Sequence, residues 1–181
     1  NRMDRENADF ESVLTKLQAK WGPRVVPLQI PVGSQASFRG VIDLLHMKAY
    51  TGEDFSEEDV PADMLEHAEE LRAKLIEVIV ETDEALMEKY FADEALSEDE
   101  LRQVLHGGLD HRLIIPVTCG AAAKLSGVPQ LLHNIAFSGP SPADRDPFAS
   151  DSGDLDADPN GPIAVQVFKT SADPYVGKLT Y

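Results

Sequence analysis

The sequence contains a single cysteine, Cys119, so it offers no partner for an internal disulfide and no cysteine cluster for a metal. Long apolar runs are also missing, and no stretch approaches the roughly 20 residues that a membrane-spanning helix needs. No segment has the composition of a secretory signal peptide. These absences predict a cytoplasmic location as the default and no membrane partner.

Basic residues are scarce as well. Lys and Arg total 16 against 32 Asp and Glu, which gives a net charge of −16 in 181 residues. Such a surface repels phosphate backbones, so direct nucleic-acid binding is not expected. A basic protein partner suits this charge better. The apolar content of 43% is ordinary for a folded globular protein.

Two groups of residues have some features of metal sites but lack others. His106 and His111 flank a glycine pair, without a third ligand nearby in the sequence. Asp154, Asp156 and Asp158 alternate like the first ligands of a calcium loop, but Pro159 stands where that loop needs glycine. We therefore predict no metal site in this chain.

The first half of the chain alternates helix and strand patterns. Asp9 is placed to cap a helix over Phe10–Lys20, which Gly22 and Pro23 would end. Val25–Ile30 predicts a strand, at a sheet edge because it contains Pro27. Two further strands are predicted, followed by an acidic loop, and together they indicate a small, mainly antiparallel sheet: Phe38–Asp43, Leu45–Tyr50 and the loop Thr51–Asp59.

The longest predicted helix covers Ala62–Phe91. At about 100° per residue its apolar side chains fall on one side, and six glutamates fall within an arc of about 60° opposite. We call these glutamates the acidic stripe: Glu66, Glu70, Glu77, Glu81, Glu84 and Glu88. A solvated helix face explains the stripe, and so does a docking surface for a basic helix; the sequence leaves both open.

The second half contains a strand, a small-residue turn and a helix. A capping box at Ser97–Glu100 predicts a helix that ends at Gly107-Gly108. The run Ile114–Val117 predicts a buried strand, followed by Gly120 and three alanines and then by a helix over Val128–Phe137. Such a turn allows the backbone to approach a flat ligand closely. Beyond it the sequence predicts an acidic linker and a strand pair around Asp173-Pro174: Ile163–Thr170 and Val176–Tyr181.

Two short motifs resemble the base-binding elements of GTPases. Asn1-Arg2-Met3-Asp4 is similar to the Asn-Lys-x-Asp guanine motif, and Cys119–Lys124 is similar to the Ser-Ala-x loop that completes the pocket. Their order resembles translational GTPases, most closely the elongation factor G family. The supporting segments cover almost the whole chain: Asn1–Phe10, Phe38–Tyr50, Leu75–Phe91, Ile115–Val128 and Ile163–Tyr181.

The resemblance implies a role for each motif residue. Asp4 would accept hydrogen bonds from guanine N1–H and the N2 amino group, Asn1 would bond N7, and the Arg2 stem would pack on the base. Ala122 would donate its backbone N–H to O6, within the loop Ala121–Ala123. The sequence departs from the family at Arg2, where lysine is usual, and at Ala121, where serine is usual, and a register of Ala122-Ala123-Lys124 fits nearly as well.

The resemblance also implies an α/β fold class with an α+β insert. In this interpretation the chain is the C-terminal part of a P-loop GTPase-type domain with an inserted mixed α/β subdomain, followed by a truncated β-barrel start. The implied divisions are a GTPase part at 1–24, the insert at 25–112, a GTPase strand, loop and helix at 113–138, an acidic linker at 139–162 and the β-barrel start at 163–181.

The phosphate-binding motifs of a GTPase are absent from these residues. The sequence has no Gly-x-x-x-x-Gly-Lys-Ser/Thr loop and no Asp-x-x-Gly switch motif. We therefore expect a fragment that does not hydrolyse GTP, of a parent that binds GTP/GDP and promotes ribosomal translocation. The implied partner is the ribosome, including its stalk protein through the acidic stripe. Alternatives are a ribosomal-protection or release-factor-type GTPase, and a non-enzymatic acidic module that binds a basic protein.

Overall fold

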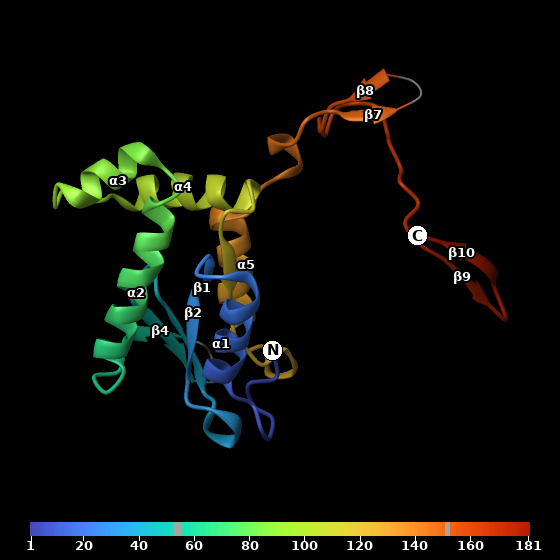
Figure 1. Ribbon diagram of the computed structural model, residues 1–181. Coiled ribbons are helices and arrows are strands. Elements are labelled where there is room, and N and C mark those ends of the chain that lie inside the picture. The colour runs from blue at the N-terminus through green and yellow to red at the C-terminus, as the bar shows by residue number, and fades with distance from the viewer. Residues whose placement is uncertain (53–55, 151–152) are drawn as a thin grey trace. The chain divides into compact units, whose positions relative to one another are not determined.

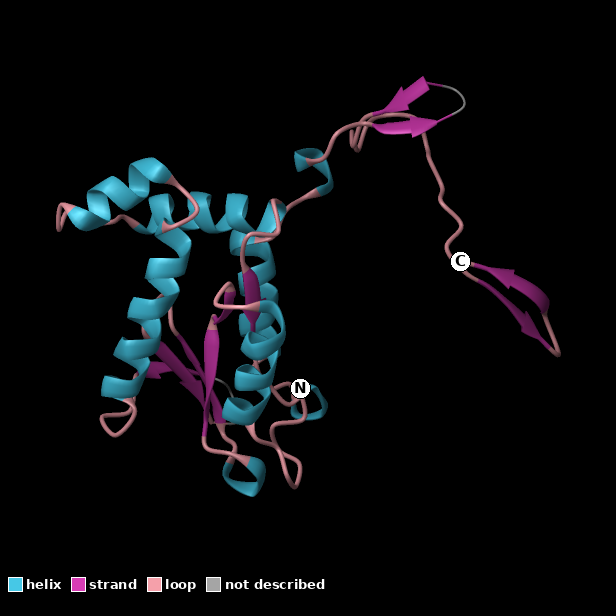
Figure 2. Ribbon diagram, viewed as in Figure 1, coloured by secondary structure: helices cyan, strands magenta, loops and turns pink. Residues whose placement is uncertain are grey.

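The computed structural model describes residues 1–52, 56–150 and 153–181 and divides the chain into two units, Asn1–Pro140 and Ser141–Tyr181. Both units mix strands with loops, and the first adds five α-helices within its described residues, so the fold class is mixed α/β (Figures 1 and 2). None of the helices in the described part of the chain is long and apolar enough to cross a membrane.

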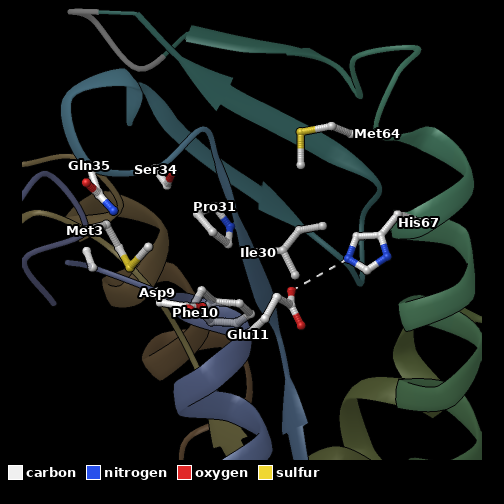
Figure 3. A pocket seen from close by; sticks show the side chains of 11 residues that line it. Met3, Asp9, Phe10, Glu11, Ile30, Pro31, Ser34, Gln35, Met64 and His67 are labelled. Atoms are coloured by element: carbon white, nitrogen blue, oxygen red, sulfur yellow. Dashed lines mark ion pairs between the residues drawn. The ribbon is translucent and has the colours of Figure 1, made fainter. Parts of the chain in front are cut away.

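The first helix, α1 (Phe10–Trp21), forms as its sequence predicts. The Asp9 side chain accepts a hydrogen bond from the Ser12 N–H at 2.9 Å and so caps the helix. Gly22, with φ of 83°, ends it in a conformation that favours glycine. The starts of α1 and of α2 (Leu65–Val80) flank strand β2 (Gln29–Val32), as Figure 3 shows with Phe10, Ile30 and His67.

The predicted strand Val25–Ile30 is two strands in the structure. β1 (Val25–Pro27) pairs in parallel with β6 (Ile115–Val117), whereas β2 pairs antiparallel with β3 (Gly40–Asp43). Leu28 joins them: its N–H donates to Val117 O at 2.9 Å, and its carbonyl accepts from Leu44 N at 3.0 Å. Because the β1–β6 ladder has only two strands among the described residues, Pro27 does lie at an edge.

The antiparallel sheet has the order β2-β3-β4-β5. It includes β4 (Lys48–Thr51) and β5 (Ser56–Asp59). The sequence-based prediction of an acidic loop over Thr51–Asp59 is wrong for residues 56–59, because β4 provides a ladder partner for them. Residues 53–55 of that loop lie outside the described residues.

The predicted helix Ala62–Phe91 is also interrupted. It forms α2 and then α3 (Glu84–Phe91), with Asp83 as the N-cap of α3, where its carboxylate accepts from the Leu86 N–H at 2.9 Å. A capping side chain of this kind starts a new helix instead of extending the old one. The acidic stripe is therefore divided between two helices.

Helix α4 (Glu98–Asp110) begins as predicted but ends later. The capping box forms, with Ser97 Oγ accepting from the Glu100 N–H at 3.3 Å and Glu100 Oε2 accepting from the Ser97 N–H at 2.9 Å. The prediction that Gly107-Gly108 stops the helix is wrong. Gly108 is buried against Ile114, where a Cβ would lie 2.6 Å from the Ile114 Cδ1. Because Gly108 has no side chain, Ile114 can pack directly against this turn of α4.

Strand β6 and helix α5 (Val128–Ser138) follow the predicted order, but their burial differs from the prediction. Ile114 is buried, whereas Ile115 and Val117 of β6 are only half-buried. On α5 the polar Gln130, Asn134 and Ser138 are buried, and the apolar Leu131, Leu132 and Ile135 are exposed. Periodicity predicted the helix correctly but could not predict which face is covered.

The second unit contains two short hairpins. The expected linker includes β7 (Phe148–Ser150) and β8 (Gly153–Leu155), while its residues 151 and 152 lie outside the described residues. The predicted strand Ile163–Thr170 is wrong over most of its length, because regular pairing begins only at β9 (Thr170–Asp173). β10 (Gly177–Thr180) pairs with it across the predicted turn.

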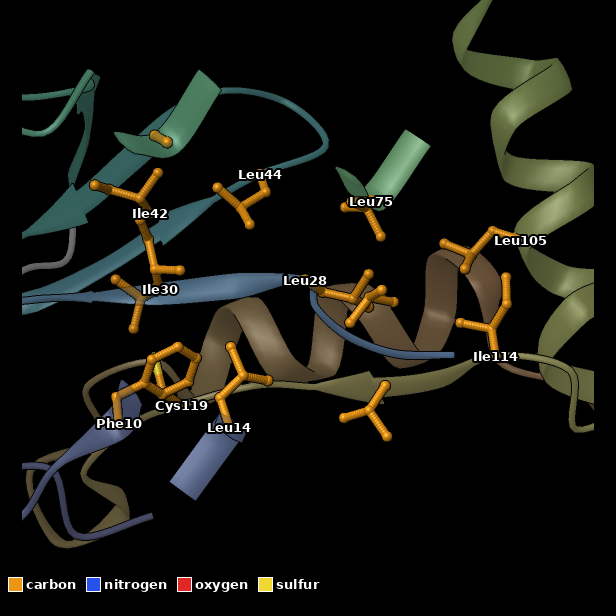
Figure 4. Packing of buried hydrophobic residues seen from close by; sticks show 14 of the residues in the cluster. Phe10, Leu14, Leu28, Ile30, Ile42, Leu44, Leu75, Leu105, Ile114 and Cys119 are labelled. Atoms are coloured by element: carbon orange, nitrogen blue, oxygen red, sulfur yellow. The ribbon is translucent and has the colours of Figure 1, made fainter. Parts of the chain in front are cut away.

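The core of the first unit lies on both faces of the antiparallel sheet, because the neighbouring Val41 and Ile42 of β3 point to opposite faces and both are fully buried. Leu28, Ile30, Ile42 and Leu44 from the strand segments form one buried cluster with side chains of α1, α2 and α4 (Figure 4). Leu75 and Leu105 are fully buried in this cluster. Each buried side chain of this size contributes about 1.5–3 kcal/mol relative to exposure. This core holds β6, and with it the loop that follows β6, next to the N-terminal segment.

Candidate functional site

The loop Asn1–Asp4 and the loop Gly120–Lys124 lie side by side, although almost the entire chain of the first unit separates them. The Met3 N–H donates to the Gly120 carbonyl at 3.1 Å, and the Ala122 N–H donates to Asn1 Oδ1 at 3.1 Å. Asn1 Oδ1 also accepts from the Arg2 N–H at 2.7 Å. These bonds hold the two predicted base-binding motifs in contact.

A cavity of about 460 Å³ lies between these loops. It is lined by five of the six residues that the resemblance implicates and by Arg5: Asn1, Arg2, Asp4, Arg5, Ala122 and Ala123. Ala121 does not line it, because this residue is buried and its N–H donates to the Ser126 carbonyl at 2.9 Å. The structure thus brings the motif residues together and places Ala121 behind them.

Asp4 is the most sheltered polar group of the cavity. Its side chain is only 9% exposed, and its Oδ2 lies 3.6 Å from Lys124 Nζ. A carboxylate presents two acceptor oxygens, so it matches a ligand edge that carries two adjacent N–H donors. Lys124 and Arg5 were not predicted as site residues; for Lys124 the sequence signal was the alternative register, whereas Arg5 had no signal.

The backbone on both sides of the cavity adopts uncommon conformations. Arg2 has φ of 64° and Leu125 has φ of 59°, values that non-glycine residues rarely adopt. Gly127, with φ of 77°, packs so closely that a Cβ would lie 2.6 Å from the Cys119 carbonyl oxygen. Backbone strain of this kind concentrates at binding sites, where surrounding contacts maintain it.

Cys119 lies at the end of β6, behind the loop. It is buried, and burial raises the pKa of its thiol to about 12. A thiol with such a pKa is protonated at neutral pH and is a poor nucleophile or metal ligand. Cys119 therefore supports the loop as a small apolar side chain.

The acidic stripe forms no cavity. All six of its glutamates are exposed, with Glu66, Glu70 and Glu77 on α2, Glu81 at the α2 C-cap, and Glu84 and Glu88 on α3. Exposure of this kind fits a solvated face as well as a docking surface. Within the described ranges, no group of three or more His, Cys, Asp or Glu side chains is arranged to hold a metal ion.

A search of protein-family models finds no match to this chain. Among solved structures, the fold is similar to that of a protein from Thermus thermophilus, with a TM-score of 0.74 and 28% sequence identity. The similarity covers 96% of this chain but 25% of the other protein, so the chain spans about a quarter of the length of this relative.

Proposed function

We propose that this chain is the base-recognising part of a translational GTPase of the elongation factor G type. The observation that carries the proposal is the hydrogen-bonded contact between Asn1–Asp4 and Gly120–Lys124 beside a cavity that residues of both loops line. Two motifs that resemble GTPase elements would have no reason to meet if each were an unrelated turn.

The cavity suits a guanine base. Asp4 would accept from guanine N1–H and the N2 amino group, and the Arg2 stem would cover the ring. The Ala122 N–H donates to Asn1 Oδ1 in the free chain, and it would exchange this bond for one to guanine O6. Adenine lacks donors at these positions and would give the sheltered Asp4 carboxylate, whose other neighbour is Lys124 Nζ, no hydrogen bond in place of water, at a cost of about 1–3 kcal/mol.

Phosphate binding and hydrolysis require residues that the sequence does not contain. Without a phosphate loop or switch motif, no residue here is assigned to magnesium or to the attacking water. The proposal therefore places GTP/GDP binding and ribosomal translocation in a longer protein. The exposed apolar side chains of α5, Leu131, Leu132 and Ile135, support packing against a further part of such a protein.

The partner proposed for this chain is the ribosome, with the acidic stripe contacting the stalk protein. A ribosomal-protection or release-factor-type GTPase has the same layout and remains the second candidate within the family. A non-enzymatic acidic module is the candidate from another class, and the six exposed glutamates favour it. Asp4 distinguishes the two GTPase candidates from the acidic module, because only a GTPase needs Asp4 to face a base.

Titration of the labelled chain with GDP and with ADP, followed by amide NMR, tests the proposal. We expect millimolar binding of GDP, with shifts confined to residues 1–5 and 119–125, and no comparable shifts with ADP. GTP turnover should be undetectable. Shifts that are equal for both nucleotides, or that lie elsewhere, would contradict a guanine site.

The variant Asp4→Asn tests whether Asp4 sets the preference for the guanine base. It replaces an acceptor oxygen by a donor amide, so binding should move from GDP towards xanthosine diphosphate. Asp63→Asn, an exposed position outside the cavity, makes the same chemical change and should leave the GDP preference intact.

A further inference from the structure

A second cavity, of about 370 Å³, borders the same N-terminal segment, where Met3 forms part of its wall. We call it the α1–α2 pocket, because residues at the starts of both helices line it together with β2 (Figure 3). A cavity of this volume falls in the range of natural ligand sites. None of the functions proposed above uses it.

The inner wall of the α1–α2 pocket is apolar. Met3, Phe10 and Ile30 are buried there, and Met64 at the start of α2 is half-buried. Methionine side chains are flexible and polarizable, so they adapt to apolar groups of different shapes. This wall fits the side chain of a leucine, methionine or aromatic residue.

The polar lining includes two carboxylates, from Asp9 and Glu11, beside Ser34, Gln35 and His67, and no lysine or arginine is among the described residues that line the pocket. Asp9 is occupied as the α1 cap, whereas Glu11 Oε1 lies 3.7 Å from His67 Nε2 and both of these side chains are exposed, at 62% and 49%. The net charge of −16 adds a long-range attraction for cations.

We propose that the α1–α2 pocket binds a basic segment of a partner protein in which a lysine or arginine lies beside an apolar side chain. The apolar side chain occupies the wall of Phe10, Ile30 and Met64, and the cation pairs with Glu11. Charge complementarity selects this occupant, since an acidic segment would meet two carboxylates and no compensating Lys or Arg. The proposal does not depend on nucleotide binding.

Three fluorescein-labelled peptides test the pocket by fluorescence anisotropy with the full chain. The basic apolar probe is Gly-Lys-Leu-Lys-Gly, the basic probe without an anchor is Gly-Lys-Gly-Lys-Gly, and the acidic probe is Gly-Glu-Leu-Glu-Gly. We expect the first to bind tightest, with affinity that falls as salt is raised. Equal binding of the first two probes, or tighter binding of the acidic one, would overturn the proposal.

Matched variants locate the binding. Glu11→Gln should weaken the basic apolar probe about two- to fivefold, the range for one exposed charge pair. Glu69→Gln makes the same change of charge on α2, outside both the pocket and the acidic stripe, so it should have a smaller effect. Indistinguishable losses in the two variants would show attraction to overall charge and would overturn the site.

A matched pair of methionine variants tests the apolar wall of the α1–α2 pocket. Met64→Ala should reduce the advantage of the leucine probe over the glycine probe, whereas Met87→Ala, a half-buried methionine of α3 outside the pocket, should not. Circular dichroism of each variant establishes that it folds. An unchanged advantage in a folded Met64→Ala protein would contradict the proposed anchor.

Discussion

Asp4 and Cys119 show how neighbouring loops give two polar side chains opposite roles. The Asp4 side chain lines a cavity, with its Oδ2 3.6 Å from Lys124 Nζ, so a ligand in that cavity can reach it. The Cys119 thiol lies behind the second loop, away from water. The environment, more than the residue type, decides which of the two is available for chemistry.

Cys119 should be unreactive in the folded chain. Because burial raises its pKa to about 12, little thiolate exists at pH 8, and access for reagents is also restricted. We expect Ellman's reagent to react at least about tenfold more slowly with the native chain than with the chain in guanidinium chloride. Since Cys119 is the only cysteine, the measured colour reports this site alone. Equal rates would show that the end of β6 opens readily.

At the scale of elements, the two neighbouring glycines of α4 differ in what surrounds them. Gly107 has open space around its Cα, whereas Gly108 touches Ile114. Glycine inside a helix costs about 0.5–1 kcal/mol relative to alanine, so only a packing requirement explains its presence. Gly108 meets such a requirement and Gly107 does not.

Alanine at these two positions should therefore have different effects. Gly107→Ala should raise the free energy of unfolding by about 0.5–1 kcal/mol, through helix propensity alone. Gly108→Ala should gain less or lose stability, because its Cβ would lie 2.6 Å from Ile114 Cδ1 and the side chain would have to move. Urea denaturation measures both. Equal stabilisation by the two substitutions would mean that the Ile114 side chain moves away from position 108 at no cost in free energy.

The start of α4 should make stability depend on pH. Lys89 of α3 and the Ser97 cap bond Glu100, and the pKa of Glu100 is lowered from 4.5 to about 2, first by the hydrogen bond from Lys89 and then by those from Ser97. In the unfolded chain this carboxylate takes up its proton at a higher pH. Its contribution is therefore present above pH 4.5 and is lost as the pH falls towards 2.

Glu100→Gln isolates this effect, because glutamine keeps the capping-box geometry without the charge. We expect the variant to melt at a lower temperature than the parent at pH 7, with the difference disappearing as the pH falls towards 2. Thermal melts from pH 7 to pH 2 measure it. A constant difference across this range would show that the charge of Glu100 contributes nothing.

At the scale of the whole molecule, the negative charge is distributed over more than one helix. Because α2 ends at Val80 and α3 starts at Glu84, the acidic stripe does not form a single straight row. Glu70 and Glu77 lie within α2, and Glu84 and Glu88 lie on α3. A basic partner that docks along one helix would contact one pair more closely than the other.

Two charge-reversal pairs distinguish a docking surface from a solvated face. If the acidic stripe contacts the ribosomal stalk protein as proposed, converting Glu70 and Glu77 to lysine in the proposed longer protein should slow association with the stalk protein several-fold and reduce its salt dependence. Converting Glu84 and Glu88 makes the same change of net charge and should have a smaller effect if α2 is the contact. Stopped-flow association rates measure both, since each exposed pair contributes only about 0.2–1 kcal/mol to affinity. Unchanged rates in both folded variants would leave the acidic stripe as a solvated face.

Features that depend on near neighbours in the chain were determined by the sequence. The Asp9 cap, the Gly22 end of α1 and the Ser97–Glu100 capping box all formed as predicted, because their hydrogen bonds join residues three or four positions apart. The two motifs that resemble GTPase elements were likewise visible in the sequence. Their contact was expected only through the family resemblance.

Tertiary structure decided which partner each segment finds. Leu28 separates β1 from β2 because Val117 and Leu44 bind its two backbone groups from different sheets, and no local pattern encodes that division. The end of α2 at Val80 was missed as well, although the bond by which Asp83 caps α3 joins residues only three positions apart. On α5 the covered face is polar, and the helical periodicity of the sequence did not predict which face is covered. Local sequence sets the conformations that are available, whereas long-range packing chooses among them, because burial is a property of the whole folded chain.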